Sequence, residues 1–376
     1  MKIRAFFYAF ATIAILATCL APTAIQAQHC YDYTHYLRWR THVMPPADEY
    51  GNRNARGVTV VGNLAYVGAN AAGLAIYDVT DPVNPVLLGV ADTPGACQNA
   101  VVVGNYAYVA DWYGPPGFCV VDVADPSAPT VVGTAGVGSS PVYIEVAVVK
   151  PDTVCVLDYN YGVRLINVSD PTNPDVCAGI ENYGYPRDLD VEGIYLYVTN
   201  GDDLRIFDVT VALHPDQLSD HPLPGPTGSI DVVGDYAYIA CRYAGLQIVD
   251  VSDPENPQDV GHLGIPDLFT EFIDVHVVGG LAYLKASVNN GEPGLRIVNV
   301  SDPSAPFLVN KLGAVAQNYS PGLFVANNYA YITEGSDGIF VADVSNTASP
   351  AFISSYVEQD FVPDAVAAAG DYAYVL

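Results

Sequence analysis

Residues 104–109 read GNYAYV, and residues 117–126 read GFCVVDVADP. Both stretches start at glycine and continue with aromatic and β-branched residues, and the second one ends at Asp-Pro. This composition is typical of short strands that are bounded by sharp turns. The pair therefore predicts two strands joined by the loop that lies between them.

Both phrases recur along the chain. The first occurs eight times, at steps of 41 to 48 residues, and the second follows each of the first seven copies. Copies of the first phrase lie at residues 62–67, 104–109, 151–156, 193–198, 234–239, 279–284, 327–332 and 370–375. Copies of the second lie at residues 73–82, 117–126, 162–171, 203–210, 245–254, 294–303 and 338–345. A fixed internal period of this length indicates a repeat protein.

Each repeat is predicted to form four strands. An apolar strand such as residues 100–103 precedes the first phrase, and a short strand such as residues 131–134 follows the second. Gly-Asn and Gly-Asp suit two-residue hairpin loops because these residues tolerate positive φ. A four-stranded unit of this length is the blade of a β-propeller. The sequence thus predicts an all-β fold, a single β-propeller of four-stranded blades.

The number of blades depends on the chain ends. Seven complete blades are expected between about residue 57 and residue 359, and residues 365–375 supply the first two strands of another. Residues 36–43 are predicted to be a lone outermost strand, which would close an incomplete eighth blade and remove exposed edges. A seven-bladed ring with these strands outside it is the alternative.

The N-terminus predicts export. Lys2 and Arg4 precede an apolar stretch, and small residues surround a plausible cleavage point after Ala27. The predicted domains are a signal peptide at 1–27, an N-terminal segment with the closing strand at 28–56, and a C-terminally incomplete propeller at 57–376. No other stretch approaches the ~20 apolar residues of a spanning helix. We expect a monomer that is secreted or held at the cell surface, without a membrane span.

Without residues 1–27, 12 Lys and Arg face 41 Asp and Glu, which is a net charge of −29. This charge opposes binding to nucleic acid and favours cationic partners and divalent metals, although an acidic surface that serves only solubility is the alternative. Six cysteines remain, at positions unrelated to the repeat. An exported chain permits disulfides, and we expect at most one or two.

The second phrase resembles the LVIVD-repeat family, which is named for the strand that reads LQIVD at residues 246–250 and LRIVN at residues 295–299. The resemblance covers the chain from about residue 57 to the C-terminus. It implies a bacterial or archaeal propeller that is exported or held at the cell surface. The family has no catalytic signature that could be transferred to residues of this chain.

The first group of candidate binding residues lies in the longer loops of one face, where second strands connect to third strands and each blade connects to the next. Exposed aromatic rings beside carboxylates and amides commonly stack on sugars or anchor peptides, and packing of the tyrosines between blades is the alternative. The candidates are Asp111, Trp112, Tyr113, Asp158, Tyr159, Asn160, Tyr161, Tyr183, Tyr185, Arg187, Arg242, Tyr243, Phe269 and Glu271.

The second group lies where the innermost strands begin, at the mouth of the central channel. Three carboxylates and an amide there could hold Ca²⁺ with oxygen ligands, or could form a wet, polar rim without a ligand. The equivalent positions are Gly57, Asn99, Glu145, Asp188, Ser229, Asp274, Gly322 and Ala365.

One acidic or amide residue recurs in every copy of the second phrase. A residue that every blade needs is expected to serve the blade itself, by bonding a neighbouring turn, and not to bind a ligand. The seven positions are Asp78, Asp122, Asn167, Asp208, Asp250, Asn299 and Asp343.

No catalytic motif is present: the sequence has no Gly-x-Ser-x-Gly, His-Glu-x-x-His, Cys-x-x-Cys or phosphate-binding glycine loop. The expected function is that of a non-enzymatic scaffold for an extracellular protein or glycan. The alternative is a hydrolase or lyase of an extracellular polysaccharide, with Glu145, Asp188 and Asp274 as acid and base. Carboxyls about 5 to 10 Å apart, one with a raised pKa, would favour the enzyme, and evenly spaced, solvated carboxylates would favour the scaffold.

Overall fold

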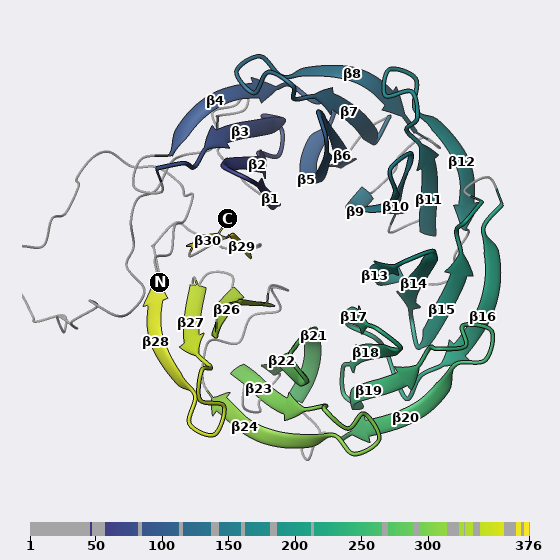
Figure 1. Cartoon of the computed structure of the whole chain (residues 1–376), viewed down its shortest axis with the longest axis vertical. Coiled ribbons are helices and arrows are strands. Elements are labelled where there is room, and N and C mark those ends of the chain that lie inside the picture. Colours follow the sequence, from purple (N-terminus) through teal and green to yellow (C-terminus); the bar gives the residue numbers. More distant parts are fainter. Residues whose placement is uncertain are drawn as a thin grey trace, which may run out of the picture.

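The strands form a ring of small sheets around a central opening (Figure 1). The computed structural model describes residue 46 and residues 57–81, 85–112, 116–136, 143–158, 162–180, 186–211, 214–264, 270–288, 294–313, 323–326, 328–333, 339–356, 366–369 and 372–375. These residues contain thirty β-strands in seven four-stranded antiparallel sheets and one two-stranded sheet. The predicted all-β class and four-stranded unit are confirmed. No helix in this part of the chain is long and apolar enough to cross a membrane.

Each four-stranded sheet uses four consecutive strands, with the first innermost, and is called a blade here. Blades 1 to 4 consist of β1 Val58–Val61, β2 Leu64–Gly68, β3 Leu74–Asp78, β4 Val86–Ala91; β5 Ala96–Val103, β6 Tyr106–Trp112, β7 Phe118–Asp122, β8 Thr130–Ala135; β9 Tyr143–Lys150, β10 Thr153–Asp158, β11 Gly162–Asn167, β12 Asp175–Ile180; β13 Pro186–Glu192, β14 Tyr195–Asn200, β15 Asp203–Asp208 and β16 Asp216–Pro222. Blades 5 to 7 consist of β17 Ile230–Val233, β18 Tyr236–Cys241, β19 Gly245–Asp250, β20 Gln258–Leu263; β21 Thr270–Val278, β22 Leu281–Val288, β23 Gly294–Asn299, β24 Phe307–Gly313; β25 Leu323–Ala326, β26 Tyr329–Thr333, β27 Ile339–Asp343 and β28 Ala351–Tyr356.

The C-terminal strands occupy a place in the ring between blade 7 and blade 1. β29 Val366–Ala369 pairs with β30 Tyr372–Val375, and β29 packs against both β1 and β25 (Figure 1). The seven complete blades agree with the sequence prediction, and β29 and β30 lie where an eighth blade was expected to begin. The signal peptide and the closing strand predicted at residues 36–43 lie outside the described residues.

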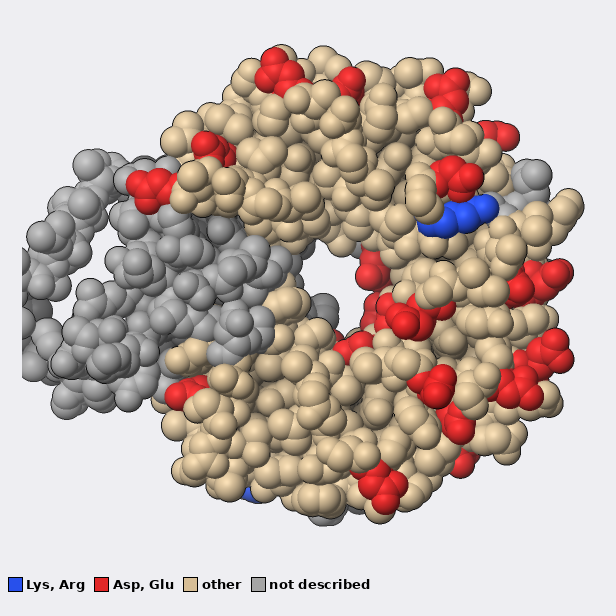
Figure 2. Space-filling view, viewed as in Figure 1, with Lys and Arg blue, Asp and Glu red and all other residues tan. Residues whose placement is uncertain are grey.

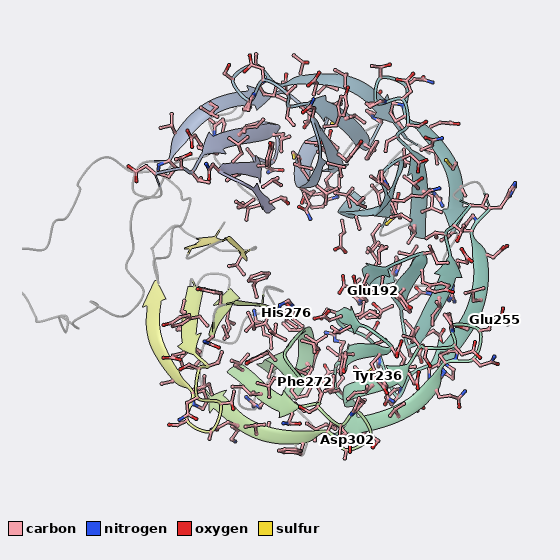
Figure 3. All side chains as sticks on the ribbon, in the orientation of Figure 1. Glu192, Tyr236, Glu255, Phe272, His276 and Asp302 are labelled. Atoms are coloured by element: carbon pink, nitrogen blue, oxygen red, sulfur yellow. The ribbon has the colours of Figure 1, made fainter. Side chains whose placement is uncertain are left out.

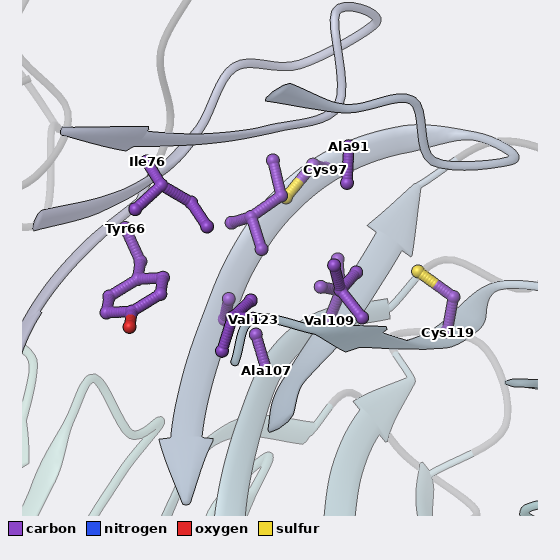
Figure 4. Close-up of a cluster of buried hydrophobic side chains, with 11 residues drawn as sticks. Tyr66, Ile76, Ala91, Cys97, Ala107, Val109, Cys119 and Val123 are labelled. Atoms are coloured by element: carbon purple, nitrogen blue, oxygen red, sulfur yellow. The ribbon is translucent and has the colours of Figure 1, made fainter. Parts of the chain in front are cut away.

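The core consists of apolar layers between neighbouring blades. In the layer between blades 1 and 2, Tyr66 and Ile76 face Val109 and Cys119, and all four side chains are buried (Figure 4). Strands of the repeat are apolar on both faces because each blade is covered on both sides. At ~25 cal/mol per Å² of buried apolar surface, these layers are the main stabilising contribution to the ring.

The described cysteines are free thiols, and most of them belong to these apolar layers. Burial raises the pKa of the Cys97 and Cys119 thiols well above its ordinary value, so both stay protonated at neutral pH. No disulfide forms among the described cysteines, which are Cys97, Cys119, Cys155, Cys177 and Cys241. Cys30 lies outside the described residues.

Two-residue turns join the first and second strands, as predicted, and in most blades the turn begins with a glycine at positive φ. In blade 2, Val103 pairs with Tyr106 around the turn, and Gly104 has a φ of 59°. The following Asn105 is not among the described residues with positive φ, which is the pattern of a type II′ turn. Glycine is thus the residue that suits the first position of this turn in blade 2.

The recurring Asp or Asn of the second phrase caps a turn in all seven blades, which confirms its predicted structural role. In blade 2, Asp122 Oδ1 accepts a hydrogen bond of 2.9 Å from the backbone N–H of Ala124. The same bond to the residue two positions later is made by Asp78, Asn167, Asp208, Asp250, Asn299 and Asp343.

A second contact between blades lies at the perimeter, where an outer strand meets the Asp-Pro turn of the next blade. A Cβ atom at Gly133 of β8 would lie 2.2 Å from the Pro171 carbonyl oxygen, so only glycine fits without a shift of backbone. At the equivalent position of β16, Ser219 Oγ donates a hydrogen bond of 2.8 Å to the Pro254 carbonyl oxygen. The outer strand and the turn therefore fit one another closely.

We expect Gly133→Ala to lower the free energy of unfolding by about 1–3 kcal/mol, because the added methyl group overlaps backbone that packing holds in place. The denaturant midpoint of the mature protein measures this change. Gly313→Ala is the control, since no atom lies within 4 Å of its Cβ position, and it should leave the midpoint unchanged. Equal midpoints for both variants would contradict the close fit.

Candidate functional site

Acidic side chains gather along one side of the central opening (Figure 2). We call the side of the ring with the loops between second and third strands the loop face, and the side with the turns between first and second strands the hairpin face. Inner strands begin at the loop face, so the predicted channel-mouth positions lie at its centre.

Carboxylates on the inner strands bond the next blade. An inner strand has only one neighbouring strand in its sheet, and its other edge carries amides that need an acceptor. Four aspartates, each from the preceding blade, supply this acceptor. Two of them link blade 4 to blade 5, one links blade 5 to blade 6 and one links blade 6 to blade 7. The bonds run from the N–H of Ile230 to Asp188 Oδ2 at 2.9 Å, Val232 to Asp190 Oδ2 at 2.7 Å, Val277 to Asp231 Oδ2 at 2.6 Å and Leu323 to Asp274 Oδ2 at 2.9 Å.

The predicted channel-mouth residues are neighbours around the ring. Ser229 Oγ donates to Asp274 Oδ1 at 2.9 Å and accepts from the N–H of Val275 at 2.7 Å. Asn99 Oδ1 accepts from its own neighbour Ala100 at 2.8 Å, beside Gly57. Gly322 and Ala365 lie outside the described residues. The structure thus brings Ser229 and Asp274 together, and sequence reasoning missed the backbone amides that these side chains bind.

Glu145 and Asp188 form a hydrogen bond between two carboxyl groups at the junction of blades 3 and 4. Burial, and then the charge of Asp188, raise the pKa of Glu145 well above its ordinary value. Burial also raises the pKa of Asp188 to about 7, although the bond from Ile230 opposes the shift. Glu145 therefore stays protonated, and its carboxyl O–H donates the hydrogen bond to Asp188. Direct contact places these carboxyls closer than the roughly 5 Å or more that separates acid and base in glycosidases.

Sequence reasoning missed several members of this cluster. Lys285 is fully buried on β22, opposite Asp274 in the sheet register, and its charge opposes the rise that burial causes in the pKa of Asp274. His276 Nδ1 lies 3.5 Å from Asp231 Oδ2, beside the opening (Figure 3). For Lys285, the available sequence signal was a lysine within the otherwise apolar strand β22. Two-residue alternation on the inner strands was the signal for Asp190 and Asp231.

On the loop face, a buried carboxylate fixes an arginine and a tyrosine of the neighbouring blade. Glu271 of blade 6 is 1% exposed, and its Oε2 accepts from Arg242 Nε at 2.6 Å. Tyr243 donates its hydroxyl to Glu271 Oε1, yet the residue is 49% exposed. Arg242 has a φ of 26°, and Asn70 at the equivalent position of blade 1 has a φ of 50°, so this conformation belongs to the loop of the repeat. We call these three residues the clamp.

Other predicted loop-face residues have different surroundings. Asp111 is fully buried and accepts from Thr93 Oγ1 at 2.9 Å and from the N–H of Gly95 at 3.0 Å, so it holds the segment between blades 1 and 2. Burial raises its pKa to about 6. Asp158 is buried, Trp112 is half-buried and Arg187 is exposed. Tyr113, Tyr159, Asn160, Tyr161, Tyr183, Tyr185 and Phe269 lie outside the described residues.

Metal ligands are not grouped in the described part of the chain. There, no three His, Cys, Asp or Glu side chains are arranged to hold a metal ion. The aspartates of the channel instead have backbone amides as partners, as described above.

Blades that repeat one sequence phrase around a channel define a β-propeller repeat protein. Models of the LVIVD repeat match residues 52–93, 94–135, 183–215, 224–263, 273–312 and 319–358. The chain belongs to the LVIVD repeat family, which confirms the resemblance seen in its sequence.

Solved structures with a similar fold are distant in sequence. The computationally designed Ika8 protein is 9% identical with a TM-score of 0.65, and the match covers 85% of this chain and 92% of that one. Sqt1 of Saccharomyces cerevisiae is 8% identical with a TM-score of 0.65, covering 83% and 87%. The periplasmic gluconolactonase PpgL of Pseudomonas aeruginosa is 13% identical with a TM-score of 0.59, covering 81% and 96%. These likenesses show the fold alone. No curated protein matches this chain.

We expect the thermal midpoint to fall as the pH rises from about 5 through about 7. Glu145 and Asp188 have raised pKa values in the folded state, so their stabilising contribution is complete below their ordinary values of 4.5 and 3.8 and is lost as the pH rises through the folded values, about 7 for Asp188. In Glu145→Gln the amide donates at every pH, and we expect the fall in midpoint to be smaller by at least ~2 °C.

Glu192→Gln is the matched control, because Glu192 is an exposed carboxylate at the far end of β13. Its pH profile should follow that of the unsubstituted protein. The same profile in Glu145→Gln would show that the shared proton does not stabilise the junction.

Proposed function

We propose that this protein is a secreted or cell-surface scaffold that binds an extracellular protein or glycan on its loop face without catalysing a reaction. The clamp is the observation that carries the proposal. Tyr243 exposes an aromatic ring while its hydroxyl is held by the buried Glu271. A ring fixed in this way loses little conformational freedom when a partner packs on it, which favours binding.

The channel carboxylates support a scaffold more than an enzyme. Asp188, Asp190, Asp231 and Asp274 each accept a backbone amide of the following blade. A group that gains and loses a proton during turnover would weaken such a bond in every cycle. Their chemistry therefore fits the assembly of the ring.

A hydrolase or lyase of an extracellular polysaccharide is the second candidate. It is favoured by the raised pKa of Asp188, about 7, beside the protonated Glu145, since an acid and a base that act near neutral pH need such values. The gluconolactonase of similar fold is 13% identical, so its activity carries no weight here.

Charge and the N-terminal sequence support the location and the type of partner. The export signal predicted at residues 1–27 would direct the protein out of the cytoplasm. A net charge of −29 on the remaining chain attracts cationic groups and accelerates their encounter with the ring. Cationic peptides and amino sugars are therefore the first probes to use.

The test is a thermal-shift screen of the mature protein with a lysine-rich peptide, chitosan oligosaccharides and neutral polysaccharides, followed by titration of the probe that raises the midpoint. We expect Tyr243→Ala to weaken binding of that probe at least tenfold, since exposed aromatic anchors contribute most to such interfaces. Val233→Ala is the control, because Val233 is 45% exposed on the hairpin face, and it should bind as the unsubstituted protein does.

Equal binding by both variants would contradict the role of the clamp. Cleavage of a polysaccharide that Glu145→Gln abolishes would establish the enzyme and overturn the scaffold.

A further inference from the structure

A groove crosses the hairpin face between blades 2 and 3. It is open to solvent and has a volume of about 510 Å³, within the range of ligand-binding pockets. One wall is formed by β6 and the turn before it, and the other by two turns of blade 3. Its lining residues are Val103, Gly104, Asn105, Tyr106, Tyr108, Pro151, Asp152, Val168, Ser169 and Pro171.

The walls of this groove are rigid and aromatic. Tyr106 and Tyr108 are two residues apart on β6 and therefore share one face of the sheet. Tyr108 is 3% exposed and stacks on Phe118 with 6.4 Å between ring centroids, so its position is fixed. Pro151 and Pro171 line the opposite wall, and their rings restrict φ. The groove is thus largely formed before any ligand enters.

The turn of blade 3 departs from the repeat at this groove. Gly62, Gly104, Gly193, Gly234 and Gly279 begin the corresponding turns with φ near +60°, a conformation that proline cannot adopt. Blade 3 has Pro151 there, and the pairing of β9 with β10 shifts register directly after the turn, between Thr153 and Val154. Blade 3 therefore lacks the favoured glycine turn, and Pro151 forms part of the groove wall instead.

The chemistry of the groove fits a polyproline II segment. Such a segment has no internal hydrogen bonds, so its carbonyl groups need donors, which the Tyr106 hydroxyl, the Asn105 amide and the Ser169 hydroxyl supply. Tyr106 is partly exposed, and a proline ring of the ligand can pack on its aromatic ring. Aromatic grooves bind proline-rich segments because the ligand is already extended and loses little entropy.

Charge selects among such segments. The Asp152 side chain is 56% exposed at the rim, and its ion pair with Lys150 has a separation of 3.5 Å. Exposed pairs of this kind are weak, and Lys150 Nζ also donates to the Thr210 carbonyl oxygen of blade 4 at 3.3 Å. A basic side chain of the ligand would gain from Asp152 and from the net charge of the ring.

We propose that the groove between blades 2 and 3 binds an extended, proline-rich segment of a partner protein that carries a basic side chain next to Asp152. This site lies on the opposite face from the clamp and is independent of it.

The test is a fluorescence anisotropy titration of the full mature chain with a labelled peptide of four Arg-Pro-Pro repeats. A peptide with alanine in place of proline is the matched ligand. We expect saturable binding of the first peptide, at least tenfold weaker binding of the second, and at least a tenfold loss in Tyr106→Ala. Asp152→Asn should weaken binding severalfold at low salt and less at high salt, because salt screens the pair.

Tyr236→Ala is the matched control variant. Tyr236 has the same position in the repeat in blade 5, but the turn that faces it is Gly279-Gly280 in place of Pro151-Asp152. Thermal denaturation shows whether each variant is folded. The groove and the clamp lie on opposite faces and are tested by separate substitutions, so failure of one proposal is distinguishable from failure of the other.

Absence of binding to the proline-rich peptide would overturn the proposal, as would equal binding of the alanine peptide or equal losses in Tyr106→Ala and Tyr236→Ala. Binding of chitosan or neutral oligosaccharides that Tyr106→Ala removes, without peptide binding, would make the groove a sugar site and would also overturn it.

Discussion

The inner strand of each blade has an edge without a neighbouring strand, and the amides of that edge determine much of what lies in the channel. Water is one acceptor for such amides, and a side chain of the preceding blade is another. Here the second solution is repeated from blade 4 to blade 7, with aspartates as acceptors. Acidic residues in the channel therefore follow from the way the blades are joined. Their raised pKa values follow too, because a carboxylate held against a blade junction is partly removed from water.

Much of this fold could be predicted because it is repeated. The strand order, the two-residue turns and the capping Asp122 are local features, and seven copies allow the same inference to be made seven times. The ring of channel-mouth positions could be predicted as well, since equivalent residues of a ring meet at its centre. Contacts between residues that are not equivalent could not. Glu271 of blade 6 binds Arg242 of the neighbouring blade 5, and Asp111 holds the segment around Thr93, with no periodic signal for either pairing.

Protonation and burial were the other features beyond reach of the sequence. Asp111 and Arg242 both looked like loop-face candidates, yet one is fully buried and the other is fixed by a buried carboxylate. The shared proton of Glu145 and Asp188 depends on how deeply two adjacent blades bury them. Where this chain departs from its own repeat, at Pro151, Arg242 and Lys285, it gains features that a uniform ring would lack. Those positions distinguish the two faces of the ring more than the repeated sequence phrases do.

The perimeter contact has a consequence for how such rings arise. Gly133 of one blade fits the turn at Pro171 of the next, and Gly261 fits the turn at Pro303 in the same way. A single repeat thus encodes both halves of the contact, the outer strand on one side and the turn on the other. Duplication of a whole repeat in the gene produces a blade that already matches both neighbours. At this perimeter contact, an added repeat therefore needs no compensating change in its neighbours.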